Sequence, residues 1–261
     1  MQDEEWNEMQ KGLNDLSWNE YSKEYNDLST FDDKLLHLGL GIPGQDASLF
    51  VKSDMKVLDV GCGNGTNTHI MSRYTNEIVV GIDFAYPSIK SAQKAYQANN
   101  LIFLQYSFCD FVQKENCSVY DLITFWGSLD YMRLNDDFFT ALNKITVEKS
   151  SCVISKFHPF WSTLYDNDVD PEQGHSYFEN GREDRIRYGK DRSHEFIRFH
   201  YTIGYMLDRF KKYGWNISRI LEPKPDFKAS AFTYQDYDTD SRLMARLSRI
   251  PMTIIMIFVR R

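Results

Sequence analysis

The chain has 261 residues, of which 30 are Lys or Arg and 37 are Asp or Glu, so its formal net charge is −7 at pH 7. An acidic chain does not hold nucleic acid through its overall field, which argues against a non-specific DNA- or RNA-binding protein. Apolar residues make up 42% of the sequence, enough for the core of one large domain or of a domain with an insertion.

The sequence carries no signal for membrane insertion or for an oxidising compartment. No apolar run is long enough to span a bilayer, and the acidic N-terminus lacks the basic and apolar regions of a signal peptide. The four cysteines form no C-x-x-C pair and have no histidine at zinc spacing. We therefore expect a cytoplasmic protein with reduced cysteines and no bound metal.

An aromatic stripe marks the segment before the first predicted strand. Spacings of three and four residues, typical of one face of a helix, connect Trp18, Tyr21, Tyr25 and Leu28. In the simplest interpretation this face packs onto the rest of the protein.

A glycine-rich stretch follows the first apolar run. Residues 56–66 read KVLDVGCGNGT, with a carboxylate at Asp59 and glycines at alternate positions from Gly61 to Gly65. Such glycines let the backbone turn sharply and let a ligand lie against it. The helix predicted over residues 66–74 directs its first N–H groups towards that ligand. The stretch predicts a nucleotide-like ligand site at the end of the first strand of an open α/β sheet.

The second predicted strand also ends in an acid. Residues 77–83 read EIVVGID, and Asp83 lies 18 residues after Gly65. A carboxylate at this strand tip is the acceptor that a ribose diol needs. Dinucleotide folds favour G-x-G-x-x-G over alternate glycines, which argues against a nicotinamide cofactor. Together the two strands resemble motif I and the second strand of the class I S-adenosylmethionine (SAM)-dependent methyltransferases.

The resemblance covers about residues 15–261 and implies a fold and a domain plan. The fold is α/β and Rossmann-like, with a seven-stranded, mostly parallel sheet, an antiparallel last strand and helices on both faces. Residues 1–50 are a helical cap over the site, and residues 51–261 are the SAM-binding domain. An insertion over about 160–200 sets substrate specificity and is expected to be the least regular part. The small-molecule type, similar to ubiquinone and menaquinone methyltransferases, fits best.

The resemblance also implies the cofactor, SAM, which leaves as S-adenosylhomocysteine (SAH). Asp110, after the strand predicted over 101–106, is placed like the family's adenine-binding acid in a loop, and capping of a short turn is the alternative. Phe111 is expected to add a backbone group and an apolar wall for the base. The expected cofactor-binding residues are Tyr21, Tyr25, Asp59, Gly61, Cys62, Gly63, Asn64, Asp83, Phe84, Cys109, Asp110, Phe111, Trp126, Gly127 and Leu129.

Three residues are candidates for the proton acceptor, and the sequence does not rank them. Asp130 follows the strand predicted over 120–126, at a position where many relatives carry histidine. His158 follows the strand predicted over 151–157, and His200 precedes a helix that Thr202 is expected to cap. The expected substrate-binding residues are Tyr131, Trp161, Tyr165, His175 and Tyr177.

The last predicted elements complete the sheet. A short helix is expected over residues 240–248 and a seventh strand over 252–259. In the family that the chain resembles, this strand runs antiparallel between the fifth and the sixth strands.

The methyl group of SAM is electrophilic, so the protein mainly aligns a nucleophile and excludes water. We interpret the chain as an enzyme that methylates an oxygen or nitrogen atom of a small molecule, in natural-product or cofactor biosynthesis. An aromatic or an anionic acceptor suits the aromatic and basic residues of the insertion. The alternatives are an RNA or protein methyltransferase and a SAM-binding regulator without turnover. Neither a nucleic-acid nor a membrane partner is expected, and the oligomeric state stays open.

Overall fold

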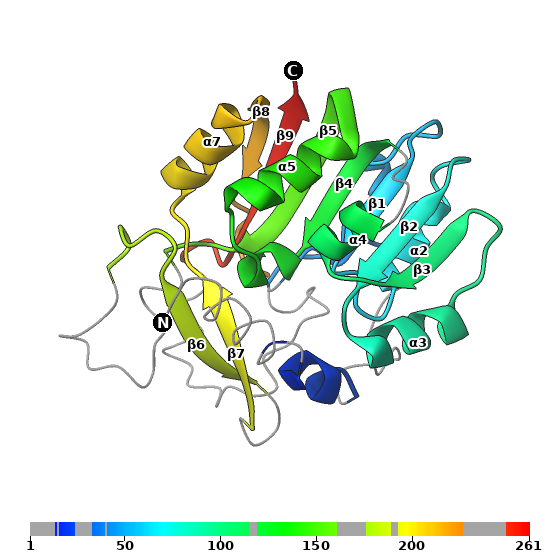
Figure 1. The fold of residues 1–261 in the computed structure, drawn as a ribbon, viewed down its shortest axis with the longest axis horizontal. Coiled ribbons are helices and arrows are strands. Elements are labelled where there is room, and N and C mark those ends of the chain that lie inside the picture. The colour runs from blue at the N-terminus through cyan, green and yellow to red at the C-terminus, as the bar shows by residue number, and fades with distance from the viewer. Residues whose placement is uncertain are drawn as a thin grey trace.

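A seven-stranded sheet forms the centre of the molecule (Figure 1). The computed structural model describes residues 14, 16–23, 33–39, 41–114, 119–160, 176–188, 193–226 and 249–261. The strands are β1 (Val57–Val60), β2 (Val79–Asp83), β3 (Leu101–Gln105), β4 (Tyr120–Trp126), β5 (Thr146–Phe157), β8 (Trp215–Leu221) and β9 (Thr253–Arg260). Their order is β3-β2-β1-β4-β5-β9-β8, and β9 runs antiparallel to both β5 and β8. The predicted fold class and the antiparallel seventh strand are confirmed.

The central parallel strands are covered on both faces. All four residues of β1 are buried, and Val57 pairs with Val79 of β2 on one side and with Leu122 of β4 on the other. Parallel strands buried on both faces read as continuous apolar runs, which is why the sequence located them. The bounds predicted for β4 are those observed.

The start of β5 was not predicted. The strand begins at Thr146, five residues before the expected start at Ser151, and its pairing with β4 shifts register between Tyr120 and Leu122. Within this bulge Lys149 has a φ of +72°. The charged and polar residues there have the sequence pattern of a turn, which is why the strand was not predicted to begin before Ser151.

Helices cover both faces of the sheet. In Figure 1 the face turned to the viewer carries α4 (Phe108–Lys114), α5 (Asp136–Lys144) and α7 (Ile203–Lys212). Their aromatic and aliphatic residues form the larger core cluster with the strands. A second cluster joins the sheet to α2 (Thr66–Ser72), to η2 (Ala47–Leu49) and to neighbouring residues of the segment 36–51. A third, small cluster seats α3 (Tyr86–Ala95).

Local signals explain most helix boundaries. Thr202 caps α7 by accepting a hydrogen bond from the backbone N–H of Tyr205, as predicted. The expected loop around Asp110 is instead the first turn of α4, so that prediction was wrong. Ser107 donates its hydroxyl to Asp110 (2.7 Å) and accepts from the Asp110 backbone N–H (3.3 Å), a pairing that resembles a capping box. The helix predicted over 240–248 lies outside the described residues.

The insertion contains regular structure where an irregular stretch was expected. Strands β6 (Glu183–Tyr188) and β7 (His194–Phe199) form an antiparallel hairpin, because aromatic and branched residues alternate with charged ones there. Figure 1 shows this hairpin beside the dark-blue N-terminal helix, on the side where the parallel strands of the main sheet end. No helix in the described part of the chain combines the length and apolarity needed to cross a bilayer.

The N-terminal helix, residues 16–23, docks on the free edge of β7. The Asn14 side chain donates to the Ile197 carbonyl (3.1 Å) and accepts from its N–H (2.8 Å). Ser17 donates to the Glu195 carbonyl. An amide side chain thus replaces a missing neighbouring strand and satisfies an exposed edge.

We predict that Gly65→Ala destabilises the fold strongly. Gly65 has a φ of +82°, and a Cβ there would lie 2.7 Å from the Ala92 side chain and from the Phe103 ring. Positive-φ strain and overpacking together cost about 2–4 kcal/mol, measurable by urea unfolding. The matched control is Gly214→Ala, where φ is +87° and nothing lies within 4 Å of the new Cβ. Equal losses in both variants would contradict the packing argument.

Candidate active site

The glycine loop between β1 and α2 is tied to the end of β2. The backbone N–H groups of Gly61 and Cys62 donate to the Ile82 carbonyl at 2.8 and 2.9 Å. Asp83 accepts from the N–H of Gly63 (2.9 Å) and, through its other oxygen, from that of Ala85 (2.8 Å). Desolvation raises the pKa of Asp83 to about 6. The carboxylate predicted to accept from a ribose thus also fixes the loop.

The loop leaves room for a ligand at Gly63. Its φ is +55°, and a Cβ placed there meets no atom within 4 Å. The buried Asn64 side chain has no partner for its Nδ2 among the described residues. Gly127, just past the end of β4, also has a positive φ of +79° and an equally open Cβ position. Because β4 adjoins β1, these features fit a ligand that crosses the ends of both strands.

Asp59 lies beneath the loop. It is 1% exposed, and its two oxygens accept from the hydroxyls of Thr68 (2.7 Å) and Thr124 (2.8 Å). Burial raises the pKa of Asp59 to about 6. The side chain therefore joins β1, β4 and α2 and holds the loop from below. Cys62, also buried, has its pKa raised well above the usual thiol value by desolvation.

The residues expected to bind the adenine lie only partly where they were predicted. Asp110 lies half-buried at the start of α4, next to the half-buried Cys109. The Phe111 ring is 3% exposed and packs in the core against Tyr106 and Tyr120, so it does not form the expected wall. Consecutive residues of a helix point about 100° apart, so Asp110 and Phe111 face different ways once α4 has begun before them. Phe84 is half-buried directly after Asp83.

The segment after β4 turns inward. Trp126 packs edge-on against Phe50 (5.6 Å between ring centroids), and its buried Nε1 has no partner among the described residues. Ser128–Tyr131 form a short 3-10 helix, η3. Leu129 is 1% exposed and belongs to the core, so only its backbone can face a cofactor.

Asp130 is locked in a buried ion pair. One oxygen lies 2.8 Å from Lys156 Nζ, with both side chains at most 3% exposed. The other oxygen accepts from the backbone N–H of Phe157 (3.1 Å). The carboxylate joins η3 to the end of β5, and both of its oxygens are engaged.

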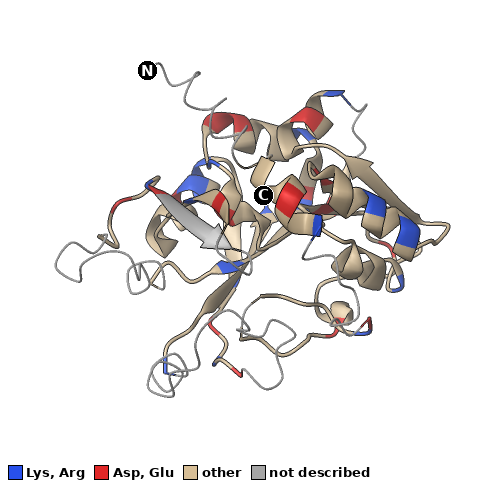
Figure 2. Ribbon diagram, turned by 90° about the horizontal axis from the view of Figure 1, so that it is seen from below, with Lys and Arg blue, Asp and Glu red and all other residues tan. Residues whose placement is uncertain are grey.

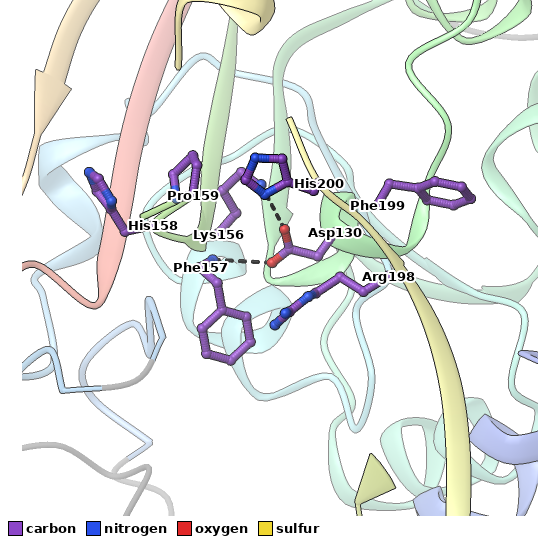
Figure 3. A pocket seen from close by; sticks show the side chains of 8 residues that line it. All are labelled: Asp130, Lys156, Phe157, His158, Pro159, Arg198, Phe199 and His200. Carbon is purple, nitrogen blue, oxygen red and sulfur yellow. Dashed lines mark hydrogen bonds and ion pairs between the residues drawn. The ribbon is translucent and has the colours of Figure 1, made fainter. Parts of the chain in front are cut away.

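The two candidate histidines differ in their hydrogen bonds. His158 Nδ1 accepts from the N–H of Phe160 (3.1 Å), which places the ring proton on Nε2, 2.9 Å from the Glu222 carboxylate. His200 Nε2 lies 2.8 Å from the Tyr177 carbonyl. A carbonyl can only accept, so Nε2 of His200 is the donor and, in the neutral ring, Nδ1 carries the lone pair. The structure brings both histidines and Asp130 to the lining of one small cavity (Figure 3).

Aromatic rings from three elements meet around the N-terminal helix. Trp18 of the N-terminal helix packs against Tyr131 of η3 (5.0 Å) and Phe196 of β7 (4.6 Å). Tyr21 joins the same cluster. Tyr177 instead lies beside His200. Four other predicted site residues, Tyr25, Trp161, Tyr165 and His175, lie outside the described residues.

Some residues at the site were not predicted from the sequence. Lys156 and Arg198 line the same cavity as the histidines, and Asn19 accepts from the N–H of Tyr86 at the start of α3 (3.2 Å). Lys156 could have been found from the sequence, because it is a charged residue at the end of an apolar strand. Nowhere in the described ranges are three or more His, Cys, Asp or Glu side chains grouped to hold a metal ion.

Known proteins of similar sequence or structure share this fold. Residues 51–200 match the family described as "Methyltransferase domain". A Listeria monocytogenes protein described as a SAM-dependent methyltransferase is similar (TM-score 0.62, 17% identity), covering 94% of this chain and 98% of that one. A SAM-dependent methyltransferase from Mesorhizobium loti covers 82% and 94% (TM-score 0.59, 18% identity).

A third similar structure has a known acceptor. It is geranyl diphosphate C-methyltransferase from Streptomyces coelicolor, solved with Mg²⁺, geranyl diphosphate and SAH. It covers 94% of this chain and 77% of that one, with a TM-score of 0.55 and 10% identity. At these identities the similarity establishes the fold. No curated protein matches the sequence.

We predict that Asp59→Asn changes the pH dependence of stability. The folded pKa is about 6 against an ordinary 3.8, so between these values the folded protein holds a proton that the unfolded chain has released. Wild-type stability attributable to Asp59 therefore falls as pH rises from about 4 to about 6, by about 3 kcal/mol in total. Relative to wild type, the variant should gain stability over this window in urea unfolding.

Asp136→Asn provides a control of opposite sign. Hydrogen bonds from Tyr213 and Arg209 lower the pKa of Asp136, so the wild type gains stability from it as pH rises. The Asp136 variant should therefore lose stability relative to wild type as pH rises towards about 4, and the difference should stay constant over the Asp59 window from about 4 to 6. A flat difference for Asp59→Asn would contradict the argument from burial.

Proposed function

The chain belongs to the methyltransferase-domain family, and from this premise we propose that it transfers the methyl group of SAM to an oxygen or nitrogen atom of a small-molecule acceptor. One observation carries the proposal: Asp83 at the tip of β2 holds an open glycine loop at the tip of β1. The same fold in proteins described as SAM-dependent methyltransferases supports it.

In this proposal the chain's own residues bind and orient the cofactor. Asp83 accepts from the ribose hydroxyls, since a carboxylate can accept more hydrogen bonds than the two that it receives from the Gly63 and Ala85 N–H groups. Gly63 and Gly127 let the ligand approach the backbone, and Asn64 Nδ2 offers it an unused donor. Bound SAM supplies an electrophilic methyl group on its sulfonium sulfur. Tyr21 and the other cofactor residues predicted from the sequence keep that role as proposals.

A small acceptor is favoured by what covers the site. The N-terminal helix contacts the start of α3 through Asn19 and β7 through Ser17, so it connects the main sheet's helices to the β6–β7 hairpin. We propose that residues 1–50 and the insertion over 160–200 enclose the acceptor above the domain formed by 51–261, which suits a small molecule better than a polymer. In Figure 2, Lys and Arg positions are interspersed with Asp and Glu positions, unlike a basic nucleic-acid track.

The three candidate bases lie in the lining of one cavity. Both Asp130 oxygens are engaged, and the His158 lone pair accepts a backbone N–H. His200 Nε2 donates to the Tyr177 carbonyl, which fixes the tautomer of its neutral ring. We propose that one of the two histidines removes the proton from a hydroxyl or ammonium acceptor.

We predict that Asp83→Ala weakens SAH binding by about 10- to 100-fold, since hydrogen bonds to a charged group contribute about 1.5–3 kcal/mol. Isothermal titration calorimetry measures this directly. Asp121→Ala is the matched control, because Asp121 also accepts a backbone N–H, from Lys56 (2.8 Å), but before the start of β1, away from the loop. Unchanged affinity in Asp83→Ala would overturn the cofactor placement.

We predict that one of the two variants His158→Gln and His200→Gln lowers turnover by about 10²- to 10⁴-fold, the usual contribution of a positioned base, while SAH affinity stays constant in both. Turnover is followed as SAH release with an acceptor found by screening small molecules first. Each variant removes a buried imidazole from the same cavity, so each is the matched control for the other. Full activity in both variants would eliminate the histidines as the base, and SAH binding without turnover of any acceptor would favour a regulator.

A further inference from the structure

The side-chain amide of Asn64 in the glycine loop is held in one orientation by Thr66. Its Oδ1 accepts from the Thr66 backbone N–H (3.3 Å) and from the Thr66 hydroxyl (2.9 Å). A backbone N–H can only donate, so the amide atom that faces Thr66 is the oxygen and not the nitrogen. Asn64 is 6% exposed, and its Nδ2 has no hydrogen-bond partner among the described residues. The amide is therefore fixed at its oxygen and unsatisfied at its nitrogen.

A phenol from outside the loop holds Thr66 in turn. The Tyr96 hydroxyl lies 3.1 Å from Thr66 Oγ1. A threonine hydroxyl has a single proton, and Thr66 gives its proton to Asn64, so Tyr96 is the donor in this contact. A chain of hydrogen bonds thus runs from Tyr96 through Thr66 to Asn64. Each bond in such a chain polarises the next, which strengthens the hold on the amide.

The Tyr96 ring is itself well supported. It directly follows α3, where its backbone N–H donates to the Ala92 carbonyl (2.9 Å). The ring stacks on His69 of α2, with 4.4 Å between the ring centroids and 18° between the ring planes. Arg73 donates to His69 Nε2 (2.8 Å), and desolvation and Arg73 together lower the pKa of His69, so the imidazole stays neutral in this stack. The phenol therefore reaches Thr66 from a support that joins the end of α3 to α2.

The two halves of the glycine loop are tied to different elements. The N–H groups of Gly61, Cys62 and Gly63 donate to acceptors at the end of β2, the Ile82 carbonyl and the Asp83 carboxylate. The Tyr96 chain ties the following part of the loop to the end of α3. The open position at Gly63 lies between these two attachments.

We propose that Tyr96 is a positioning residue of the cofactor site. Through Thr66 it holds the Asn64 side chain, and with it the loop at Gly63, in the orientation that binds the cofactor. The inference rests on the proposed binding of SAM and adds a residue that acts on the cofactor through two others.

A double-mutant cycle on SAH affinity tests the proposal with the full chain. Tyr96→Phe keeps the ring and its stacking and removes only the hydroxyl, and we expect it to weaken SAH binding about three- to tenfold in isothermal titration calorimetry. In an Asn64→Ala background the same change should have no further effect, because the group through which Tyr96 acts is gone. A tyrosine with a merely structural role would lower the affinity by the same factor in both backgrounds.

Tyr74→Phe is the matched control. Tyr74 is half-buried like Tyr96, but it follows the other end of α2, where its phenol interacts with Asp46, away from the loop. This variant should bind SAH as tightly as wild type does.

Unchanged SAH affinity in Tyr96→Phe, or equal losses with and without the Asn64 side chain, would overturn the proposal. If Asn64→Ala does not fold, Thr66→Val, which removes the middle hydroxyl of the chain, takes its place in the cycle, and the same two outcomes decide. If wild-type protein does not bind SAH, it is the proposed function that fails, so the two failures are distinguishable.

Discussion

The hydrogen bond between the Gly63 N–H and the Asp83 carboxylate is the contact on which the proposed site depends. It holds the β1 loop against the end of β2, and Asp59 supports the same loop from below through Thr68 and Thr124. Both carboxylates have pKa values raised to about 6 by desolvation. The fold therefore keeps two acids with raised pKa values, the buried Asp59 and the half-buried Asp83, where a ligand would need acceptors, which is typical of a functional site.

The other half of the sheet edge is organised by a buried ion pair. Lys156 at the end of β5 pairs with Asp130 of η3, and Arg198 of β7 lines the same cavity. The proposed cofactor site thus presents carboxylates and open glycines, whereas the cavity at the ends of β5 and β7 is lined by the Asp130–Lys156 pair and two histidines.

Much of this arrangement could be read from the sequence because it depends on local patterns. Buried parallel strands give apolar runs, and the acids and glycines at their ends fall on one edge in any such sheet, which is how Asp83 and Gly63 were found. The contacts between side chains, in contrast, are not determined by the local sequence. The inward turn of Phe111, the Asp130–Lys156 pair and the docking of Asn14 on β7 join segments whose relative placement only the folded chain defines. The capping pair of Ser107 and Asp110 is a local sequence feature, so recognising it would have predicted the start of α4.

The most direct test of the account is calorimetric titration of the wild-type chain with SAH and, separately, with NADH. A glycine loop held by Asp83 and left open at Gly63 predicts micromolar binding of SAH and none of NADH. Binding of NADH alone would contradict the interpretation of the loop, and the assignment of the candidate bases would lose its premise.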